Sequence, residues 1–431
     1  MSSIVVSGDT SGAVTLDAPT VAGTVTVTLP AASGTMVVTG SSPSLANVTA
    51  TGNLSVSGNT TLGDASTDTV LMTGAPSIGG VGYGMGMGFR NRIINGAMVI
   101  DQRNAGASVT GNDGVYTLDR TFVIATQSSK FTVQQNAGSV TPPDGFRNYL
   151  GVTSSSAYSL LSSDYFTLCQ RIEGFNTADM MFGTATAATF TLSFWVRSSL
   201  TGTFGGLLAN HPADRCYLYS YTINAANTWE KKTITVAGDT TGTWATGNTR
   251  GLQVMFCLGA GSSYVGATGS WSSTYALGPT GQTNVLGTSG ATFYITGVQL
   301  EKGSTATSFD YRPYGTELAL CQRYYEKSYD IGTALGTSAV GIVAPQITTT
   351  NYYNNGLPRW MVEKRSTPTV VIYNSNTGTV NSLYNTDSGA NVSISSLTGV
   401  NTKGFQYIYS SAAVASAGQR LEYHYTVSAE L

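Results

Sequence analysis

The chain has 431 residues, enough for about two to four domains. Charged residues make up 10% of the chain and the net charge is −2, which gives no electrostatic reason to expect binding to nucleic acid or to anionic lipid. The 51 glycines, with many Thr, Ser and Val, favour β-structure with tight turns. The 24 Tyr, 14 Phe and 5 Trp supply enough apolar surface to exclude general disorder.

The residue types that carry most enzyme chemistry are sparse. Four cysteines are too few and too widely spaced for a disulfide scaffold: Cys169, Cys216, Cys257 and Cys321. No CxxC motif indicates a zinc site, and neither His211 nor His424 stands in a catalytic motif. We therefore expect no metal and no cofactor.

The N-terminal MSSIVVSGDTSG lacks the positive region and long apolar run of a signal peptide. No run of about 18 apolar residues occurs, so no membrane span is predicted. These features suggest a protein made in the cytoplasm and released by cell lysis.

The first forty residues alternate between apolar and polar side chains. AGTVTVTLP (22–30) is the clearest case, and SGAVTLDAP (11–19) and SGTMVVTG (33–40) are weaker copies. Period two predicts half-buried strands.

Residues 41–80 contain short strand-like units that each end at a Gly or Asn turn. One such strand cannot bury its apolar face alone, and three chains wound about one axis would bury it. The alternative is a flexible Gly/Ser/Thr linker. The following YGMGMG (83–88) could form a trimeric neck in which Tyr83, Met85 and Met87 fill the centre, or a mobile linker.

Residues 89–313 read as one β-rich block. The strand candidates, joined by Gly/Ser/Thr loops, are 92–100, 120–126, 166–174, 188–198, 215–223, 230–236, 250–259 and 291–303. Their spacing predicts an antiparallel two-sheet sandwich.

The pattern changes after Pro313. GTELALCQRYYEKSY (315–329) has Leu318, Cys321 and Tyr325 at helical spacing, which predicts one short helix. Strand-like segments resume beyond it and predict a second, smaller β domain over 314–431.

Several segments in this order resemble the tail fibre or receptor-binding proteins of tailed bacteriophages. They are the 22–40 stretch, FRNRIINGAMVIDQRNAG (89–106) with YTLDRTFV (116–123), TFTLSFWVRSS (189–199), and the long run 291–329. PRWMVEKRSTPTVVIYN (358–374) echoes phage fibre tips weakly. The resemblance implies a homotrimer fixed to the virion by its N-terminal end, with a sugar-binding C-terminal half.

The middle block is also similar to carbohydrate-binding modules of jelly-roll type, through LSFWVRSS (192–199), NTWEKKTITV (227–236) and FYITGVQLEKG (293–303). The last strand of those modules often carries an acidic pair that helps to bind a structural calcium. Thr296 and Gly297 stand at that place here, so the chain departs from the pattern.

A sugar-binding face needs aromatic rings and a few polar groups that fix orientation. Trp195 alternates with Phe194 and Val196 and is expected in the core, while Trp229 is expected to pack as a lid. Four aromatics stand in Gly/Ser/Thr-rich loops and are better glycan-binding candidates: Trp244, Trp271, Tyr264 and Tyr275.

The preferred recognition site is TTNYYNNGLPRW (349–360) in the terminal domain. Its candidate residues are Tyr352, Tyr353, Asn354, Asn355 and Trp360. Asn side chains both donate to and accept from sugar hydroxyls. The alternative is a hairpin whose aromatics pack against a neighbouring subunit.

No catalytic residue is predicted. Four carboxylates at strand ends or in loops show no glycosidase pattern: Glu173, Asp179, Glu301 and Asp310. The chain also lacks a GxSxG elbow, an HExxH motif and a phosphate loop.

The sequence thus predicts a homotrimeric, non-enzymatic phage tail fibre of all-β fold, located in the virion. Residues 1–40 would attach to the tail or baseplate, 41–88 would form the shaft and neck, 89–313 a jelly-roll domain, and 314–431 a tip that binds a host-surface polysaccharide or lipopolysaccharide. The alternatives are a structural connector or baseplate decoration, and a glycan-cleaving tailspike.

Overall fold

The structure is a computed structural model that describes residues 3–7, 13–17, 77–78, 81–82, 90–339, 341–344, 347–349, 352–354, 359–410 and 419–431. The chain divides into two compact units, Met1–Met72 and Thr73–Leu431. The neck residues Tyr83, Met85 and Met87 lie outside the described residues, as does most of the predicted shaft.

The described part of the first unit contains one antiparallel pair, β1 (Ser3–Ser7) with β2 (Ala13–Asp17). β2 falls within the predicted strand 11–19, whereas 22–30 and 33–40 lie outside the described residues. A second short pair, β3 (Ser77–Ile78) with β4 (Val81–Gly82), precedes the main body.

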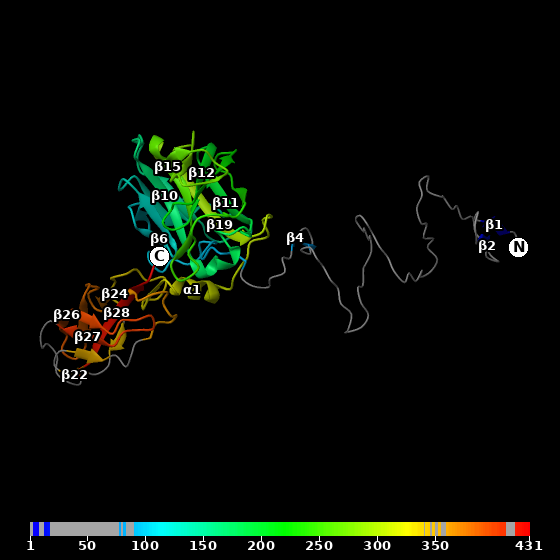
Figure 1. Cartoon of the computed structure of the whole chain (residues 1–431). Coiled ribbons are helices and arrows are strands. Elements are labelled where there is room, and N and C mark those ends of the chain that lie inside the picture. Colours follow the sequence, from blue (N-terminus) through cyan, green and yellow to red (C-terminus); the bar gives the residue numbers. More distant parts are fainter. Residues whose placement is uncertain are drawn as a thin grey trace. The chain divides into compact units, whose positions relative to one another are not determined.

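The main body is a sandwich of two antiparallel sheets (Figure 1). The seven-stranded sheet has the order β17 (Trp271–Ser272), β13 (Cys216–Ile223), β12 (Gly202–Ala209), β15 (Arg250–Ala260), β10 (Tyr165–Glu173), β7 (Thr121–Ala125) and β6 (Tyr116–Leu118). The six-stranded sheet has the order β14 (Glu230–Val236), β11 (Phe190–Ser198), β19 (Thr292–Lys302), β9 (Leu150–Ser154), β8 (Phe131–Gln135) and β5 (Val109–Thr110). Since the chain passes repeatedly from one sheet to the other between β10 and β19, the sandwich is a jelly roll.

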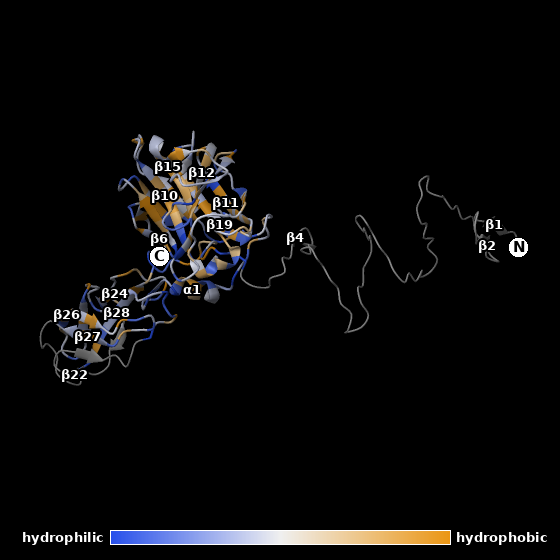
Figure 2. Ribbon diagram, in the orientation of Figure 1, coloured by the Kyte–Doolittle hydropathy of each residue, from blue (hydrophilic) through white to orange (hydrophobic). Residues whose placement is uncertain are grey.

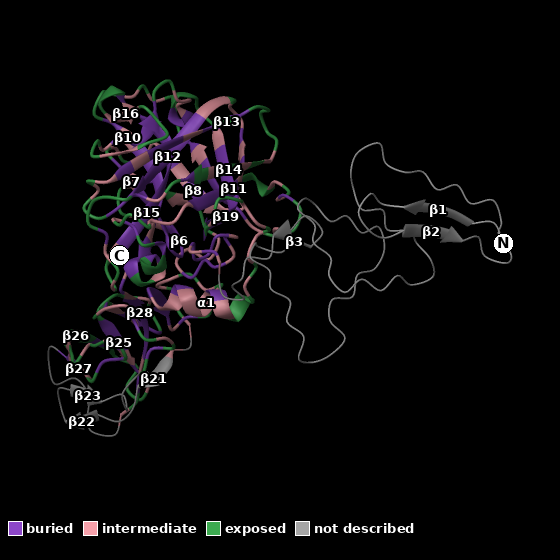
Figure 3. Ribbon diagram, turned by 45° about the vertical axis from the view of Figure 1, so that its right-hand side comes forward, coloured by how far each residue is buried: buried purple, intermediate pink, exposed green. Residues whose placement is uncertain are grey.

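The core lies between the sheets, where apolar side chains of alternate strand residues meet. Hydrophobic residues are frequent along the sandwich strands in Figure 2, and Figure 3 shows much of these strands as buried. On β11, for example, Phe190, Leu192, Phe194 and Val196 are buried in this core. The long central strands are buried along most of their length, which makes the sandwich a rigid support for its loops.

The predicted strand 92–100 is wrong. Asn95 and Met98 have positive φ, and residues 93–97 form bends and turns. The Asn95 side chain holds the turn by accepting from the Ile100 amide at 2.9 Å and donating to the Ile100 carbonyl at 2.8 Å. Asn tolerates the left-handed backbone conformation. Its side chain also hydrogen-bonds to nearby backbone groups, which then do not form the hydrogen bonds of a β-strand.

Six sandwich strands were not predicted: the short β5, β6 and β17, and the longer β8, β9 and Gly-rich β12. In β12 a side chain at Gly206 would meet the Met255 carbonyl oxygen at 1.9 Å and the Tyr219 hydroxyl at 2.5 Å. The glycine therefore allows close approach within the sheet, although glycine in a sequence argues against a strand.

The helix is shorter than predicted. α1 spans Tyr314–Gln322, and the following Tyr325–Lys327 form strand β20, which pairs with β28 (Leu421–Ser428). Cys321 and Tyr324 pack with Ile94 and Ile100 of the sandwich. Tertiary packing thus overrides the helical spacing after Gln322.

The C-terminal domain is a sheet built around β28. Its remaining strands are β21 (Ile342–Ala344), β22 (Ile347–Thr349), β23 (Tyr352–Asn354), β24 (Thr369–Asn374), β25 (Ser382–Asn385), β26 (Asn391–Thr398) and β27 (Tyr407–Ser410). Along one edge of β28, β24 pairs with residues 423–428 and β25 continues the pairing over 421–422, while β20 and β21 pair with the other edge. Ile372, Leu383, Ile408 and Leu421 are among the residues of its own apolar core.

Ion pairs join the sandwich to the C-terminal domain. Glu173 at the end of β10 is buried and accepts from Arg323 Nη2 at 2.6 Å and from the Tyr324 hydroxyl at 2.7 Å. Glu430 accepts from Arg103 Nη2 at 2.7 Å and also from Arg120, whose side chain is fully buried.

Short elements complete the described structure. A parallel pair joins β16 (Val265–Gly266) to β18 (Gly278–Pro279). The 3-10 helices are Ala137–Ser139, Gly174–Asn176, Ala178–Met180, Ser262–Tyr264 and Val285–Gly287. In the residues that are described, no helix is long and apolar enough to cross a membrane.

Candidate functional site

Two tryptophans proposed as sugar contacts lie in or against the sandwich core. Trp244 is 9% exposed, its ring centroid is 4.7 Å from that of Phe182, and its Nε1 donates to the Thr241 carbonyl at 3.2 Å. Trp271 is half-buried against Trp244, with ring centroids 5.5 Å apart, and its Nε1 donates to the Ala237 carbonyl at 2.8 Å. Neither indole leaves its N–H free for a sugar.

Of the preferred tip cluster, the structure describes the side chain of Trp360. Trp360 is 6% exposed and belongs to the core of the C-terminal domain. Tyr352, Tyr353 and Asn354 form β23, whose backbone pairs with β27, and Asn355 lies outside the described residues. The ring of Trp360 therefore has little surface to offer a sugar.

The structure does bring Tyr264 and Tyr275 together. Their ring centroids are 6.3 Å apart, and Tyr165 lies on the other side of Tyr264 at 4.7 Å, both pairs being edge-to-face. All three rings are partly exposed. We call this group the tyrosine face.

The tyrosine face lies on the outer side of the seven-stranded sheet. On β15, Leu252, Val254 and Phe256 point into the sandwich core, so Met255 and Cys257 point outward. The segment 261–278 packs on these outward residues and carries Tyr264 and Tyr275, while Tyr165 begins β10. Sequence reasoning missed Tyr165 because it stands in a strand.

The hydroxyl groups of Tyr165 and Tyr275 stay protonated at neutral pH. Burial raises the pKa of Tyr275, and nearby Tyr165 adds to the effect. Burial likewise raises the pKa of Tyr165, with a smaller contribution from Tyr264. Neutral phenols both donate to and accept from sugar hydroxyls.

A second aromatic group lies on the six-stranded sheet. Trp195 was predicted in the core, but it lies on the outward face of β11, where it is half-buried. A side chain at Gly297 would meet Phe146 at 2.6 Å and Trp195 at 3.1 Å. Phe146 also contacts Phe309 and the exposed Tyr311, with ring centroids 5.1 and 5.5 Å away.

Trp229 packs beside this sheet as the predicted lid. Its ring centroid is 5.6 Å from that of Tyr149, and its Nε1 donates to the Thr141 carbonyl at 2.9 Å. Thr296, at the place of the missing acidic pair, donates to the Asn148 carbonyl at 2.7 Å. Across the ranges that the structure describes, no group of three or more His, Cys, Asp or Glu residues could hold a metal ion.

Each of the four carboxylates considered for catalysis forms an ion pair or hydrogen bonds within the fold. Glu173 binds Arg323 and Tyr324, as described above. Asp179 Oδ2 accepts from Arg92 at 2.8 Å. Glu301 and Asp310 accept from backbone amides, of Thr307 at 2.9 Å and of Arg90 at 2.8 Å.

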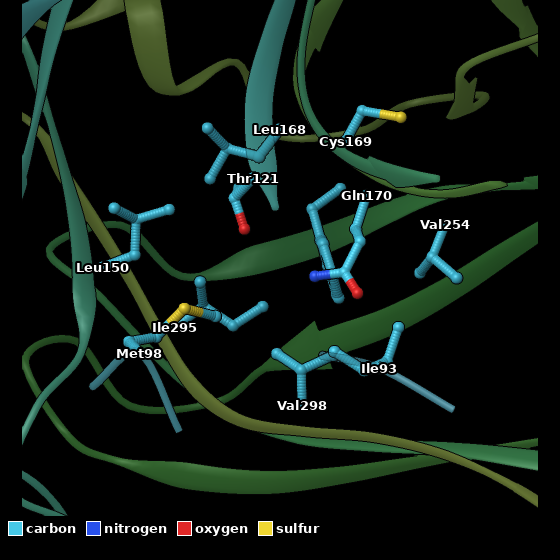
Figure 4. Close-up of a pocket in the computed structure, with 11 residues that line it drawn as sticks. Ile93, Met98, Thr121, Leu150, Leu168, Cys169, Gln170, Val254, Ile295 and Val298 are labelled. Carbon is cyan, nitrogen blue, oxygen red and sulfur yellow. The ribbon is translucent and has the colours of Figure 1, made fainter. Parts of the chain in front are cut away.

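A small cavity inside the sandwich has a volume of about 20 Å³ (Figure 4). Its lining is mostly apolar and includes Ile93, Met98 and Leu150. The side-chain amide of Gln170 beside it accepts a hydrogen bond from the Ile94 amide and donates one to the Ile94 carbonyl, both at 2.9 Å. A space of this size holds no more than a water, so it is not a sugar site.

Solved structures similar to this chain include a phage domain and sugar-binding domains. The enzymatically active domain of tailspike protein 4 from bacteriophage CBA120 is 13% identical, with 49% of this chain and 21% of that chain covered, at a TM-score of 0.25. A putative sugar binding protein from Bacteroides thetaiotaomicron is 12% identical over 50% of this chain and 100% of that chain, at a TM-score of 0.29. The N-terminal cellulose-binding domain of Cellulomonas fimi β-1,4-glucanase C is 13% identical over 41% and 91%, at a TM-score of 0.23.

The chain thus spans about a fifth of the length of the tailspike chain. No protein-family model matches it, and no curated protein matches it either.

Proposed function

We propose that this chain is a homotrimeric phage tail fibre that binds a host-surface glycan on the tyrosine face, without cleaving it. The three adjoining, partly exposed rings of Tyr165, Tyr264 and Tyr275 carry the proposal. The sequence resemblance of 89–106 and 291–329 to phage fibres supports the virion part, with residues 1–40 attached to the tail or baseplate.

The tyrosine face has the chemistry that pyranose rings require. Aromatic rings pack on the apolar C–H faces of sugars, and protonated phenols supply oriented hydrogen bonds at the rim. The rigid strand β10 positions Tyr165, and the packing of 261–278 on the sheet positions the other two rings. Such shallow sites bind weakly, and three copies in each fibre would supply avidity.

The proposal moves the binding site from the predicted tip to the sandwich. Trp360, the anchor of the predicted tip site, is used in the core of its own domain. Binding without cleavage is supported by the engagement of Glu173 and Asp179, together with Glu301 and Asp310, in structural hydrogen bonds and ion pairs.

Replacing Tyr264 with alanine is expected to weaken adsorption of the full-length protein to host cells about tenfold, because one stacked ring contributes roughly 1–2 kcal/mol. The fold should persist, since the ring lies outside the sandwich core. Flow cytometry of labelled protein on host cells gives the affinity, and thermal unfolding checks the fold.

Tyr311→Ala is the matched control, because Tyr311 is 56% exposed on the other sheet. Its adsorption should equal that of the unmodified protein. If Tyr311→Ala weakens adsorption while Tyr264→Ala does not, the glycan site is on the six-stranded sheet and the proposed site is wrong.

The trimer has a separate test. Residues 41–80 contain too little apolar sequence in each strand-like unit to bury a core within one chain. Light scattering of the full-length protein should give three times the chain mass of 44.9 kDa. A stable species of one chain mass would contradict the fibre proposal.

A further inference from the structure

A cavity of about 400 Å³ between the sandwich and the C-terminal domain is lined in part by three arginine side chains. Its lining residues are Arg171, His211, Thr249, Arg250, Arg365 and Leu431. A space of this volume admits a sugar ring with an attached charged group.

The cavity lies on the same outer side of the seven-stranded sheet as the tyrosine face, about 20 Å along β10 from Tyr165. Arg171 is on β10, six residues after Tyr165. Both side chains therefore lie on the outward face of the strand, away from the sandwich core. Arg250 begins β15, the strand paired with β10, and its positive charge acts on the Tyr275 hydroxyl. One extended ligand could therefore contact both the tyrosine face and the cavity.

The charges of the three arginines are not matched by side-chain carboxylates. Among the described residues, none of the ion pairs within 4.0 Å includes these arginines, although ten pairs are formed elsewhere. By contrast, two other arginines of the sandwich, Arg103 and Arg120, form ion pairs with Glu430.

The hydrogen-bond partners of Arg365 and Arg250 are neutral groups. Arg365 donates to the carbonyls of Ala429, Asn248 and Glu430 at 2.8–2.9 Å. Arg171 donates to the main-chain oxygen of Leu431.

Arg250 donates to the Gln253 side-chain oxygen at 3.0 Å and contacts His211 Nδ1. The Nε atoms of Arg171 and Arg250 are buried and have no hydrogen-bond partner within the described ranges.

Crowding of cations at this place is electrostatically costly. Burial and the nearby Arg171 lower the pKa of Arg250, and burial followed by Arg250 and Arg171 lowers the pKa of His211. Unmatched guanidinium groups in a cavity favour an oxyanion, because their planar N–H groups match the geometry of carboxylate and phosphate oxygens.

We infer that this cavity binds the carboxylate or phosphate group of an anionic saccharide. The neighbouring sugar rings of the same glycan then lie along the tyrosine face. The inference rests on the proposed glycan-binding function for the identity of the ligand, but the oxyanion site can be tested without any glycan.

The full-length protein is titrated calorimetrically with inorganic phosphate, glucuronate, glucose 6-phosphate and glucose. Phosphate and at least one anionic sugar should bind, and glucose should bind at least tenfold more weakly than its charged counterpart. Comparing glucuronate with glucose 6-phosphate distinguishes a polysaccharide carboxylate from a lipopolysaccharide phosphate as the natural group.

Two variants probe the cavity in different ways. Arg250→Gln removes one cation, and Thr249→Glu places a negative charge at the exposed rim without altering a buried contact. Each should weaken binding of the anions about tenfold or more, since a hydrogen bond to a charged group contributes about 1.5–3 kcal/mol. Arg147→Gln, at an exposed arginine outside the cavity, removes the same charge and should leave binding unchanged.

Two results would overturn the inference: equal binding of glucose and its charged counterparts, or anion binding that neither Arg250→Gln nor Thr249→Glu weakens. Absence of any response to phosphate and to both anionic sugars would also overturn it, because the protein oxygens already bonded to the arginines would then satisfy them. Failure of the proposed function looks different: phosphate would bind in the cavity while the protein failed to adsorb to host cells.

Discussion

Replacing Glu326 with glutamine is expected to lower the free energy of unfolding by about 3–5 kcal/mol, because it leaves a buried lysine without its counter-charge. The side chains of Glu326 and Lys364 are 1% and 0% exposed, and Lys364 Nζ lies 2.5 Å from Glu326 Oε2. Lys364 also donates to the carbonyls of Gln322 at 2.6 Å and Val362 at 2.8 Å.

Urea unfolding of the full-length protein measures the effect. Asp387→Asn is the control, since the Arg420–Asp387 pair at 3.0 Å is much more exposed and its loss should lower the free energy of unfolding far less. The double variant Glu326→Leu/Lys364→Met should be more stable than either single substitution, because an apolar pair needs no desolvated charge. A loss below about 1 kcal/mol in Glu326→Gln would contradict the buried pair.

The same variant has a pH dependence of known sign. Burial lowers the pKa of Lys364 below its ordinary 10.5, an effect that Glu326 opposes. Without the carboxylate the folded protein binds fewer protons than the unfolded chain at pH values between the lowered pKa and 10.5. The stability of Glu326→Gln should therefore rise with pH across that window.

Replacing Trp360 with alanine is expected to destabilise the C-terminal domain by about 3–5 kcal/mol, as large truncations in well-packed cores do. The Trp360 ring centroid lies 5.4 Å from that of Tyr425 and 5.7 Å from that of Phe405. Its Nε1 donates to the Asn401 carbonyl at 3.0 Å. Calorimetry of the full-length protein should show the loss.

Trp360→Phe is the matched substitution, since it keeps an aromatic ring and removes the indole N–H. It should cost roughly 1–3 kcal/mol for the unsatisfied carbonyl and the smaller ring. An alanine variant that unfolds like the unmodified protein but no longer adsorbs to cells would restore the predicted tip site.

The sequence was informative where alternation and burial agree. The predicted strand 188–198 matches β11 at Phe190–Ser198, because apolar residues alternate there and fill the core. It failed where local rules compete with tertiary contacts. The glycines of β12 gave no strand signal in the sequence. The left-handed backbone of Asn95 turns the chain within an apolar run. Tyr325 lies in a strand paired with β28 and not in the predicted helix.

The candidate site was predictable only in part. Loop composition identified Tyr264 and Tyr275 as candidates, and their role in binding stays a prediction. Tyr165 joins them because β10 pairs with β15, which places Tyr165 opposite Ala260 and next to the segment that follows it. Arg171, Arg250 and Arg365 belong to three distant segments, so the cavity that they line depends on long-range pairing that no local pattern reveals.

The ion pairs that join the two domains affect how the protein can be divided for experiments. Cutting the chain near residue 313 would strip Glu173 of Arg323 and leave the buried Arg120 without Glu430. Each fragment would then contain charged side chains that have lost their ion-pair partners. Because of this, each fragment is expected to unfold at a lower temperature than the intact protein and to aggregate. We expect residues 90–431 of the intact protein to melt in one calorimetric transition, so variants in either half are best compared in the undivided polypeptide.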